Sequence, residues 1–348
     1  MTEAPFPFVV GVARSGTTVL RDMLDLHPDL AVVDESYFIT RVYRSRHRYV
    51  RDGRLDVDLL VEGLEREPQY ERFRAVWGPG MELVRSRLAA TPSREYPELV
   101  RCLYRLYAEL QGKPRYGDKT PWYVHDVEIL ADLLPEARFV HIIRDGHNVA
   151  LSLKEVHFGP RRLAVAADTW SMLVARGLAA GRSLGPRRYL EVRYEDLVED
   201  AEPALRSVCE LFELDFRPEM LTPLGSFREE PPDHARRRSY DTTTWLRDWR
   251  REMSRRQVEV VESVAGQRLA ELGYPVLYPG RRATSRVAAW LSVTPHRVRR
   301  RAGRWRFFLR QLRRAGRRRL SRLRGAAGRL RLRARAAAGR ALERFRGS

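Results

Sequence analysis

The stretch that decides the fold runs from residue 6 to residue 26 and reads FPFVVGVARSGTTVLRDMLDL. Its first part, Phe6–Val12, is apolar and rich in β-branched residues, which is typical of a buried strand. A polar loop, Ala13–Thr18, follows it. Beyond the loop, apolar residues recur at the spacing of a helix, at Val19, Leu20, Met23, Leu24 and Leu26. The pattern predicts a strand, a loop and a helix in succession.

Four further segments have the pattern of short strands. They are Leu30–Val33, Arg115–Gly117, Arg138–Ile143 and Tyr189–Val192. Helical patterns separate them, and this alternation predicts an α/β fold of three layers, a mostly parallel sheet with helices on both faces. Polar residues follow several of these strands, at the edge where such sheets bind ligands. The charged, mainly helical segment from Tyr37 to Gln111 is expected to face the substrate.

The first loop has the form Gly11-x-x-x-x-Gly16-Thr17-Thr18 and resembles a phosphate-binding loop, in which backbone N–H groups and a helix N-terminus face an anion. A loop that binds a nucleoside triphosphate has lysine where this chain has Thr17. The strand Arg138–Ile143 ends in Arg144 and Asp145 instead of the single acid of a magnesium site. These differences favour a second phosphate site over a metal site, and we expect no metal.

The motifs resemble those of the sulfotransferases that use 3′-phosphoadenosine 5′-phosphosulfate (PAPS). Four features match in order and spacing: Arg14-Ser15-Gly16-Thr17-Thr18, Glu35 after the second strand, Asp118-Lys119-Thr120-Pro121, and Arg144-Asp145-Gly146 with Ser152 eight residues beyond Arg144. The segment Arg193–Leu197 is a fifth and weaker matching feature. The resemblance covers Phe6 to Pro279. The pairing of Arg14 with a glutamate 21 residues later is most similar to the tyrosylprotein and carbohydrate branches of the family.

The resemblance implies a P-loop-like sulfotransferase fold with a site for each end of PAPS. The 5′-phosphosulfate would bind at Arg14, Ser15, Gly16, Thr17 and Thr18, and the 3′-phosphate at Arg144 and Ser152. Tyr194 would lie near the nucleotide, although packing under the sheet explains it equally well. Ser239 lies where relatives place a loop that closes over the cofactor, although a solvated charge run also explains its arginine neighbours.

The same resemblance implies the catalytic residues. Sulfuryl transfer to a hydroxyl is expected to proceed in line, with charge building on the leaving-group oxygen, and Arg14 and Lys119 would meet that charge. Glu35 would take the proton of the acceptor hydroxyl.

Simpler roles for these residues stay open. Glu35 could cap the helix that follows it, and Lys119 could be a solvated turn residue. Arg144 could merely pair with Asp145. His125 is a second-choice base. His141 lies inside an apolar strand and is expected to be a hydrogen-bonded core residue.

Charge divides the chain of 348 residues into two regions. Residues 284–348 hold 22 arginines and one acid, Glu343, for a charge of +21, so residues 1–283 carry −1 of the total of +20. We expect a sulfotransferase domain over 1–283 and a basic tail over 284–348, although a compositional bias toward arginine would produce the same excess. Apolar residues recur in this tail at helical spacing, at Trp305, Leu309, Leu312, Leu320, Leu323 and Leu330.

Such a tail has three interpretations. As an amphipathic helix it would lie on an anionic membrane, which we favour, and nucleic-acid binding is a weaker alternative because no recognition motif accompanies the charge. A disordered tail without a partner is the third. The N-terminus lacks the features of a signal peptide, and no stretch approaches the about 18 apolar residues of a membrane span. We expect a cytoplasmic protein, with the tail as a route to the inner membrane face.

The two cysteines, Cys102 and Cys209, have no metal-ligand or disulfide spacing and are expected to be buried as small apolar residues. For the whole chain we expect a PAPS-dependent sulfotransferase that modifies a hydroxyl on a carbohydrate, lipid, peptide or natural product. A phosphotransferase with the same type of loop is the alternative enzyme, and a non-catalytic protein of the membrane surface is the alternative of another class.

Overall fold

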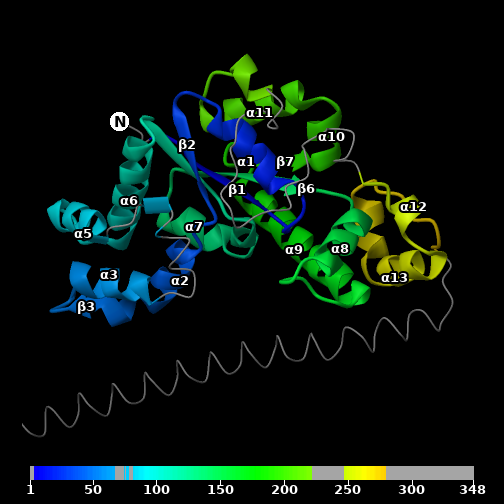
Figure 1. Cartoon of the computed structure of the whole chain (residues 1–348), viewed down its shortest axis with the longest axis horizontal. Helices are drawn as coiled ribbons and strands as arrows, with labels where there is room; N and C mark the ends of the chain where they lie inside the picture. Colours follow the sequence, from blue (N-terminus) through cyan, green and yellow to red (C-terminus); the bar gives the residue numbers. More distant parts are fainter. Residues whose placement is uncertain (1–3, 67–73, 75, 78–80, 222–246, 280–348) are drawn as a thin grey trace, which may run out of the picture. The chain divides into compact units, whose positions relative to one another are not determined.

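Five parallel strands form the central sheet, in the order β2-β5-β1-β6-β7 (Figure 1). Their bounds are β1 Phe6–Gly11, β2 Leu30–Asp34, β5 Arg115–Lys119, β6 Ala137–Ile143 and β7 Tyr189–Arg193. Each lies on a segment that the sequence pattern predicts as a strand. The register places Asp34 opposite Lys119 and Gly11 opposite Ile142. The predicted α/β fold class is confirmed.

The computed structural model describes residues 4–66, 74, 76–77, 81–221 and 247–279. All of them fall within the unit Met1–Ala289. The basic tail over 284–348, the expected boundary at residue 283 and Ser239 lie outside the described residues.

Helices cover both faces of the sheet, so that the strands are buried between two layers (Figure 1). The first face packs against α1 (Thr17–Asp25), α10 (Tyr194–Glu199), α11 (Ala201–Phe212) and the 3₁₀ turn η3 (Pro218–Leu221). The second packs against η2 (Pro121–His125), α7 (Val127–Leu133), α8 (Gly146–Glu155), α9 (Leu163–Leu184) and α13 (Arg255–Glu271). Because side chains alternate along a strand, Val9 and Val140 join the first core cluster, whereas Phe8 and Phe139 join the second.

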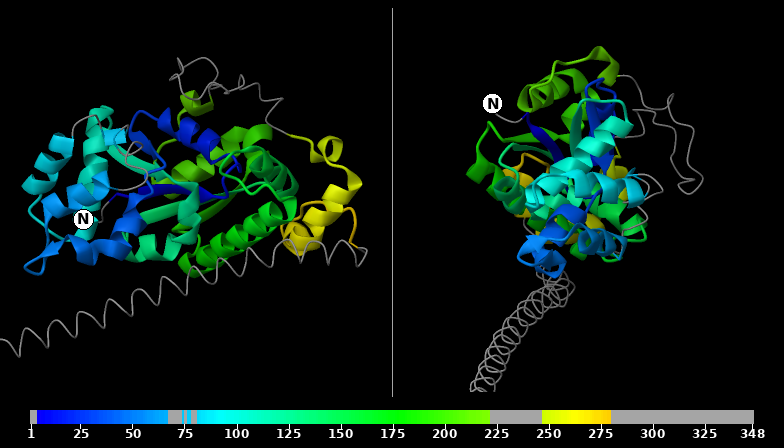
Figure 2. Two further views of the ribbon diagram at one scale, coloured as in Figure 1. Left: turned by 60° about the horizontal axis from the view of Figure 1, so that its bottom comes forward. Right: turned by 90° about the vertical axis from the view of Figure 1, so that its left-hand side faces the viewer.

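A group of helices from the segment between Tyr37 and Gln111 lies at the end of the sheet opposite to α12 (Trp249–Glu252) and α13 (Figures 1 and 2). These are α2 (Phe38–Ser45), the 3₁₀ turn η1 (Arg46–Tyr49), α3 (Val57–Glu65), α5 (Met81–Ala90) and α6 (Tyr96–Leu110). The mainly helical character that the sequence predicts is present. A hairpin of β3 (Val50–Arg51) and β4 (Arg54–Leu55) is an addition that the pattern does not show.

Helix α9 departs from the expectation that no segment is apolar and long enough to span a membrane. It has 22 residues and a mean hydropathy of 1.2 over an 18-residue window, enough by length and composition to cross a membrane. Asp168 and Arg176 interrupt its apolar run and hide that property in the sequence. Because 56% of the window is buried inside the fold, with Trp170 among the fully buried side chains, α9 is accounted for as a core helix.

Both cysteines are free thiols. Cys209 is buried as expected, and burial raises the pKa of its thiol to about 11. Cys102 on α6 is only half-buried, with its Sγ 3.1 Å from the Thr91 hydroxyl, so the expected burial is incomplete there.

Candidate functional site

Glu35 and Lys119 meet where β2 and β5 end. The backbone N–H of Glu35 donates to the carbonyl of Lys119 at 2.8 Å, and the Nζ of Lys119 lies 3.2 Å from Glu35 Oε1. The same Nζ contacts Asp34 and lies 3.4 Å from the hydroxyl of Thr18, at the start of α1. The Lys119 side chain is 1% exposed, so it is no solvated turn residue. Its charge is held among the two carboxylates and the first turn of α1.

Glu35 is fixed by its backbone as well as by its partners. Its φ is +59°, and Tyr37 follows with a φ of +54°, both in the left-handed region that side chains rarely adopt. The Tyr37 hydroxyl donates to Glu35 Oε2 at 2.7 Å. Tyr37 is the N-cap residue of α2, so Glu35 lies outside that helix and the capping alternative is wrong. Tyr37 contacts Glu35 and Asp34 contacts Lys119, and the sequence motifs give neither of these two residues a role.

The loop between β1 and α1 is shaped by Gly16, whose φ of +92° and close packing both require glycine. A Cβ built at Gly16 would lie 2.1 Å from the Tyr194 ring. Gly16 is also the N-cap of α1 and supplies no side-chain hydrogen bond there. The helix therefore presents backbone N–H groups without a side-chain cap, as an anion site requires. The buried hydroxyl of Ser15 has no hydrogen-bond partner in the described part of the chain.

A second cluster joins the residues that the resemblance assigns to the 3′-phosphate. Arg14 Nε donates to the Ser152 hydroxyl at 3.0 Å, and Arg144 donates to the Arg14 carbonyl at 3.3 Å. The Arg144 guanidinium lies over the Tyr194 ring, 4.3 Å from its centroid, and burial lowers the pKa of Arg144. Tyr194 packs under the sheet, as the simpler interpretation predicts, and it also supports the Arg144 guanidinium. The two predicted anion sites adjoin, and Arg14 bridges them.

Asp145 has partners of its own. Its Oδ1 accepts from the backbone N–H of His147 at 2.8 Å and caps α8, and its Oδ2 accepts from the indole of Trp249 at 2.8 Å. The carboxylate is therefore held by α8 and α12. The alternative that it serves merely as the ion partner of Arg144 is not needed to explain it.

The two histidines that could act as bases have different surroundings. His141 is fully buried, as predicted, but neither ring nitrogen has a hydrogen-bond partner in the described residues, so the expected hydrogen bond is wrong. Burial lowers its pKa to about 3. His125 lies on η2 with its ring 4.4 Å from that of Trp122. Within the described ranges no group of His, Cys, Asp and Glu side chains could hold a metal ion.

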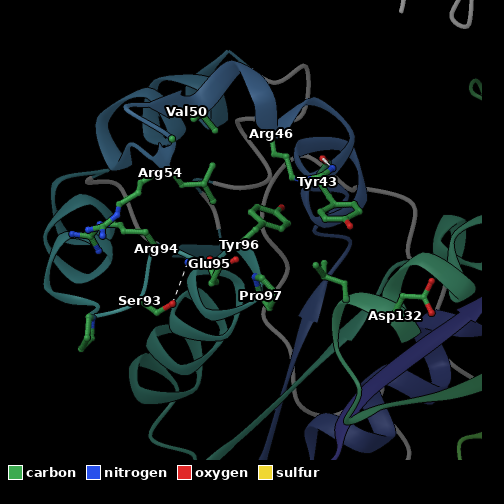
Figure 3. A pocket seen from close by; sticks show the side chains of 14 residues that line it. Tyr43, Arg46, Val50, Arg54, Ser93, Arg94, Glu95, Tyr96, Pro97 and Asp132 are labelled. Carbon is green, nitrogen blue, oxygen red and sulfur yellow. Dashed lines mark hydrogen bonds between the residues drawn. The ribbon is translucent and has the colours of Figure 1, made fainter.

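A cavity of about 770 Å³ opens in the group of helices between residues 38 and 110 (Figure 3). Its lining includes Tyr43, Arg46, Arg54, Arg94 and Tyr96. The rings of Tyr43 and Tyr96 stack at 5.9 Å, and the Arg46 guanidinium lies 4.0 Å from the Tyr43 centroid. No residue of the central five-stranded sheet lines this cavity, which is separate from the cluster around Arg14.

Comparisons with known proteins point to one family. The model of a family described as the sulfotransferase family matches residues 5–218. Protein-tyrosine sulfotransferase A of Caenorhabditis elegans is 24% identical over 216 residues, a match that covers 61% of this chain and 50% of that protein. The chain thus spans about half the length of that relative.

Two further matches cover a larger share of the matched protein. The omega-hydroxy-beta-dihydromenaquinone-9 sulfotransferase Stf3 of Mycobacterium bovis is 25% identical over 316 residues, covering 77% of this chain and 74% of that protein. Among solved structures, the sulfotransferase domain of the Synechococcus PCC 7002 olefin synthase has a TM-score of 0.54 and 21% identity, covering 78% of this chain and 96% of that one. This likeness in structure concerns the fold.

Proposed function

The chain belongs to the sulfotransferase family, and from that membership we propose that it transfers a sulfuryl group from PAPS to the hydroxyl of an acceptor. The observation that carries the proposal is the bridge from Arg14 to Ser152 and Arg144, which joins a phosphate-type loop to a second cationic cluster. Two adjoining anion sites suit a nucleotide with phosphate groups at two positions. A nucleoside triphosphate, whose phosphates form one chain, does not need the second site.

The residues present fit this nucleotide. The uncapped start of α1 and the unpartnered hydroxyl of Ser15 would hold the 5′-phosphosulfate, and Arg144 and Ser152 would hold the 3′-phosphate. When bound, PAPS would supply an activated sulfuryl group and a phosphate leaving group. Lys119 and Arg14 would provide the positive charge that meets the negative charge on the leaving oxygen.

Glu35 would be the base of the reaction. The bond from sulfur to the leaving phosphate oxygen breaks, the bond from sulfur to the acceptor oxygen forms, and the acceptor proton moves to a carboxylate oxygen of Glu35. Lys119 and Tyr37 hold that carboxylate, one at each oxygen. The base is thereby oriented before the acceptor binds.

The acceptor is proposed to carry its hydroxyl on a carbohydrate, lipid, peptide or natural product. Relatives are named for protein tyrosine and for a hydroxylated menaquinone, so a phenol and an aliphatic alcohol are both represented among them. An acceptor screen with a radiolabelled sulfur donor would identify the class. A set that contains phenols, sugars and lipid alcohols tests each group directly.

Calorimetry separates this function from that of a phosphotransferase. Adenosine 3′,5′-bisphosphate should bind the full chain without magnesium, and more tightly than ATP with magnesium. Replacing Arg144 by Gln should weaken the bisphosphate and leave adenosine 5′-monophosphate nearly unaffected. Preference for ATP with magnesium in the wild-type protein would overturn the proposal.

A further inference from the structure

The C-terminal helices contact the loop that carries Arg144, although they lie beyond residues 5–218 of the family match. Helices α12 and α13 pack beside α8 (Figure 1). Neither the motifs nor the comparisons give this segment a role. Its contacts with the β6–α8 loop are polar and buried, which sets them apart from ordinary apolar packing.

Trp249 makes the most direct of these contacts. Its side chain is 1% exposed, and its indole Nε1 donates to Asp145 Oδ2 at 2.8 Å. The indole also stacks on the His147 ring, with centroids 4.0 Å apart and planes 16° from parallel. Asp145 follows Arg144 directly, so Trp249 holds the side chain of the residue next to Arg144 in the chain.

His147 extends the contact to α13. Its Nδ1 lies 2.8 Å from Asp145 Oδ1, and its Nε2 lies 3.5 Å from Glu262 Oε1. Glu262 is fully buried, and its two carboxylate oxygens accept from the backbone N–H groups of Leu277 and Tyr278 at 2.7 and 2.8 Å. Polar contacts therefore lead from Asp145 to α13 and residue 278, although the contact between His147 Nε2 and Glu262 is not a hydrogen bond.

A third set of bonds holds the backbone of the same loop. The N–H of Asp145 donates to Glu195 Oε1 at 3.0 Å, and the Tyr274 hydroxyl donates to Glu195 Oε2 at 2.9 Å. The indole of Trp170 on α9 donates to the Arg144 carbonyl at 3.0 Å. The N–H and the carbonyl of the peptide group that links Arg144 to Asp145 are thus both held by hydrogen bonds.

We propose that Trp249 and Tyr274 are positioning residues that hold Arg144 where it recognises the 3′-phosphate, so that the C-terminal helices complete the nucleotide site. The inference rests on the proposed use of PAPS. Arg144 is long and half-buried, with its guanidinium over the Tyr194 ring, and a guanidinium binds phosphate well only when its fork is oriented in advance. Neither residue is assigned a contact with the nucleotide, since each acts through Asp145 or Glu195.

The test compares two nucleotides that differ only in the 3′-phosphate. Calorimetry on the full chain gives the ratio of the dissociation constant of adenosine 5′-monophosphate to that of adenosine 3′,5′-bisphosphate. Trp249→Phe removes the indole donor, and Tyr274→Phe removes one hydroxyl and keeps the ring. Each should lower the ratio by about 3- to 30-fold, less than the full loss of a buried hydrogen bond to a charged group, because each residue acts on Arg144 through a neighbour.

Trp77→Phe is the matched control. Trp77 is also 1% exposed and donates a buried indole hydrogen bond, to the Leu103 carbonyl at 2.7 Å, in the region of α6. It should lower the melting temperature and keep the ratio of the two constants. If Trp249→Phe does not fold, Tyr274→Phe decides alone.

The outcomes separate the two proposals. A wild-type protein that does not prefer the bisphosphate would refute the use of PAPS, and the inference with it. A wild-type preference that persists unchanged in folded Tyr274→Phe would overturn the inference and leave the proposed function intact. A change of equal size in Trp77→Phe would also overturn it, because the effect would then be one of general stability.

Discussion

Glu35 faces Lys119 because β2 and β5 are parallel neighbours whose last residues are in register. As the proposed base, Glu35 should be needed for turnover and dispensable for nucleotide binding. Glu35→Gln keeps the shape and should lower turnover by about 10²- to 10⁴-fold, the usual contribution of a positioned base. Its dissociation constant for adenosine 3′,5′-bisphosphate should stay within about threefold of wild type. Glu128→Gln, an exposed change on α7, is the control, and unchanged turnover in Glu35→Gln would show that the base is another group.

Tyr37 should hold Glu35 in the orientation that the proposed base needs. Its hydroxyl donates to Glu35 Oε2 at 2.7 Å, and Lys119 holds the other oxygen. Tyr37→Phe removes that bond and keeps the ring, so turnover should fall by about 3- to 10-fold while the dissociation constant for adenosine 3′,5′-bisphosphate stays within about threefold of wild type. Steady-state kinetics and calorimetry measure the two effects. Tyr43→Phe, a change in the adjoining helix α2, should leave turnover unchanged, and unchanged turnover in Tyr37→Phe would contradict this role.

The residues of the site differ in how far the sequence could identify them. Arg14, Lys119 and Ser152 stand in motifs with fixed spacing, and the structure brings them to one edge of the sheet. Tyr37 has no such signal, because its contact with Glu35 depends on left-handed φ values at both residues, with Ser36 between them. In the same segment the Ile39 N–H donates to the buried hydroxyl of Tyr123, a residue far away in the sequence. Sequence spacing alone does not encode that contact.

Helices and strands could be predicted from the sequence where their apolar residues follow a clear pattern. Strands β1, β2 and β6 are short apolar runs, whereas β5 reads RYGDK and β7 reads YLEVR, and all five form. Thr120 and Pro121 are good residues to begin an α-helix, yet the chain first makes the 3₁₀ turn Pro121–His125 before α7. The hairpin of β3 and β4 has two residues in each strand, too few for alternation to be visible. Packing at the end of the sheet decides these details.

Gly16 offers a test at the scale of the loop and helix. Gly16→Ala combines a φ of +92° with a Cβ that would meet the Tyr194 ring at 2.1 Å, and that ring supports Arg144. Gly53→Ala is the matched control, because Gly53 has a φ of +82° and open space around its Cβ position. The control should lose about 1 kcal/mol of unfolding free energy through backbone strain alone.

The variant Gly16→Ala should lose at least about 2 kcal/mol and bind adenosine 3′,5′-bisphosphate at least about tenfold more weakly, since Tyr194 must move. Denaturant unfolding and calorimetry measure the two effects. Equal losses of stability in both variants, with unchanged nucleotide binding, would show that Tyr194 yields without disturbing Arg144.

For the whole molecule, the buried ionisable groups determine how stability depends on pH. Burial lowers the pKa of His141 from 6.5 to about 3, so the folded protein keeps the ring neutral while the unfolded chain takes up a proton below about pH 6.5. Its share of the stability is present above that pH and is lost as the pH falls toward 3. Asp118 acts in the opposite sense, because burial raises its pKa to about 6 and the folded protein binds the proton more tightly.

Replacing His141 by Leu isolates the contribution of the histidine to the pH dependence of the unfolding free energy. Asp118 is present in both proteins, so its contribution cancels in their difference. Between pH 7 and pH 4.5 the free energy of unfolding should fall by about 2 to 3 kcal/mol less in His141→Leu than in the wild type. His157→Leu, at an exposed position, should follow the wild-type curve. Denaturant titrations at several pH values give the slopes. Parallel curves for wild type and His141→Leu would mean that the imidazole gains a proton inside the folded sheet, and that the layer formed by α9 opens to admit water.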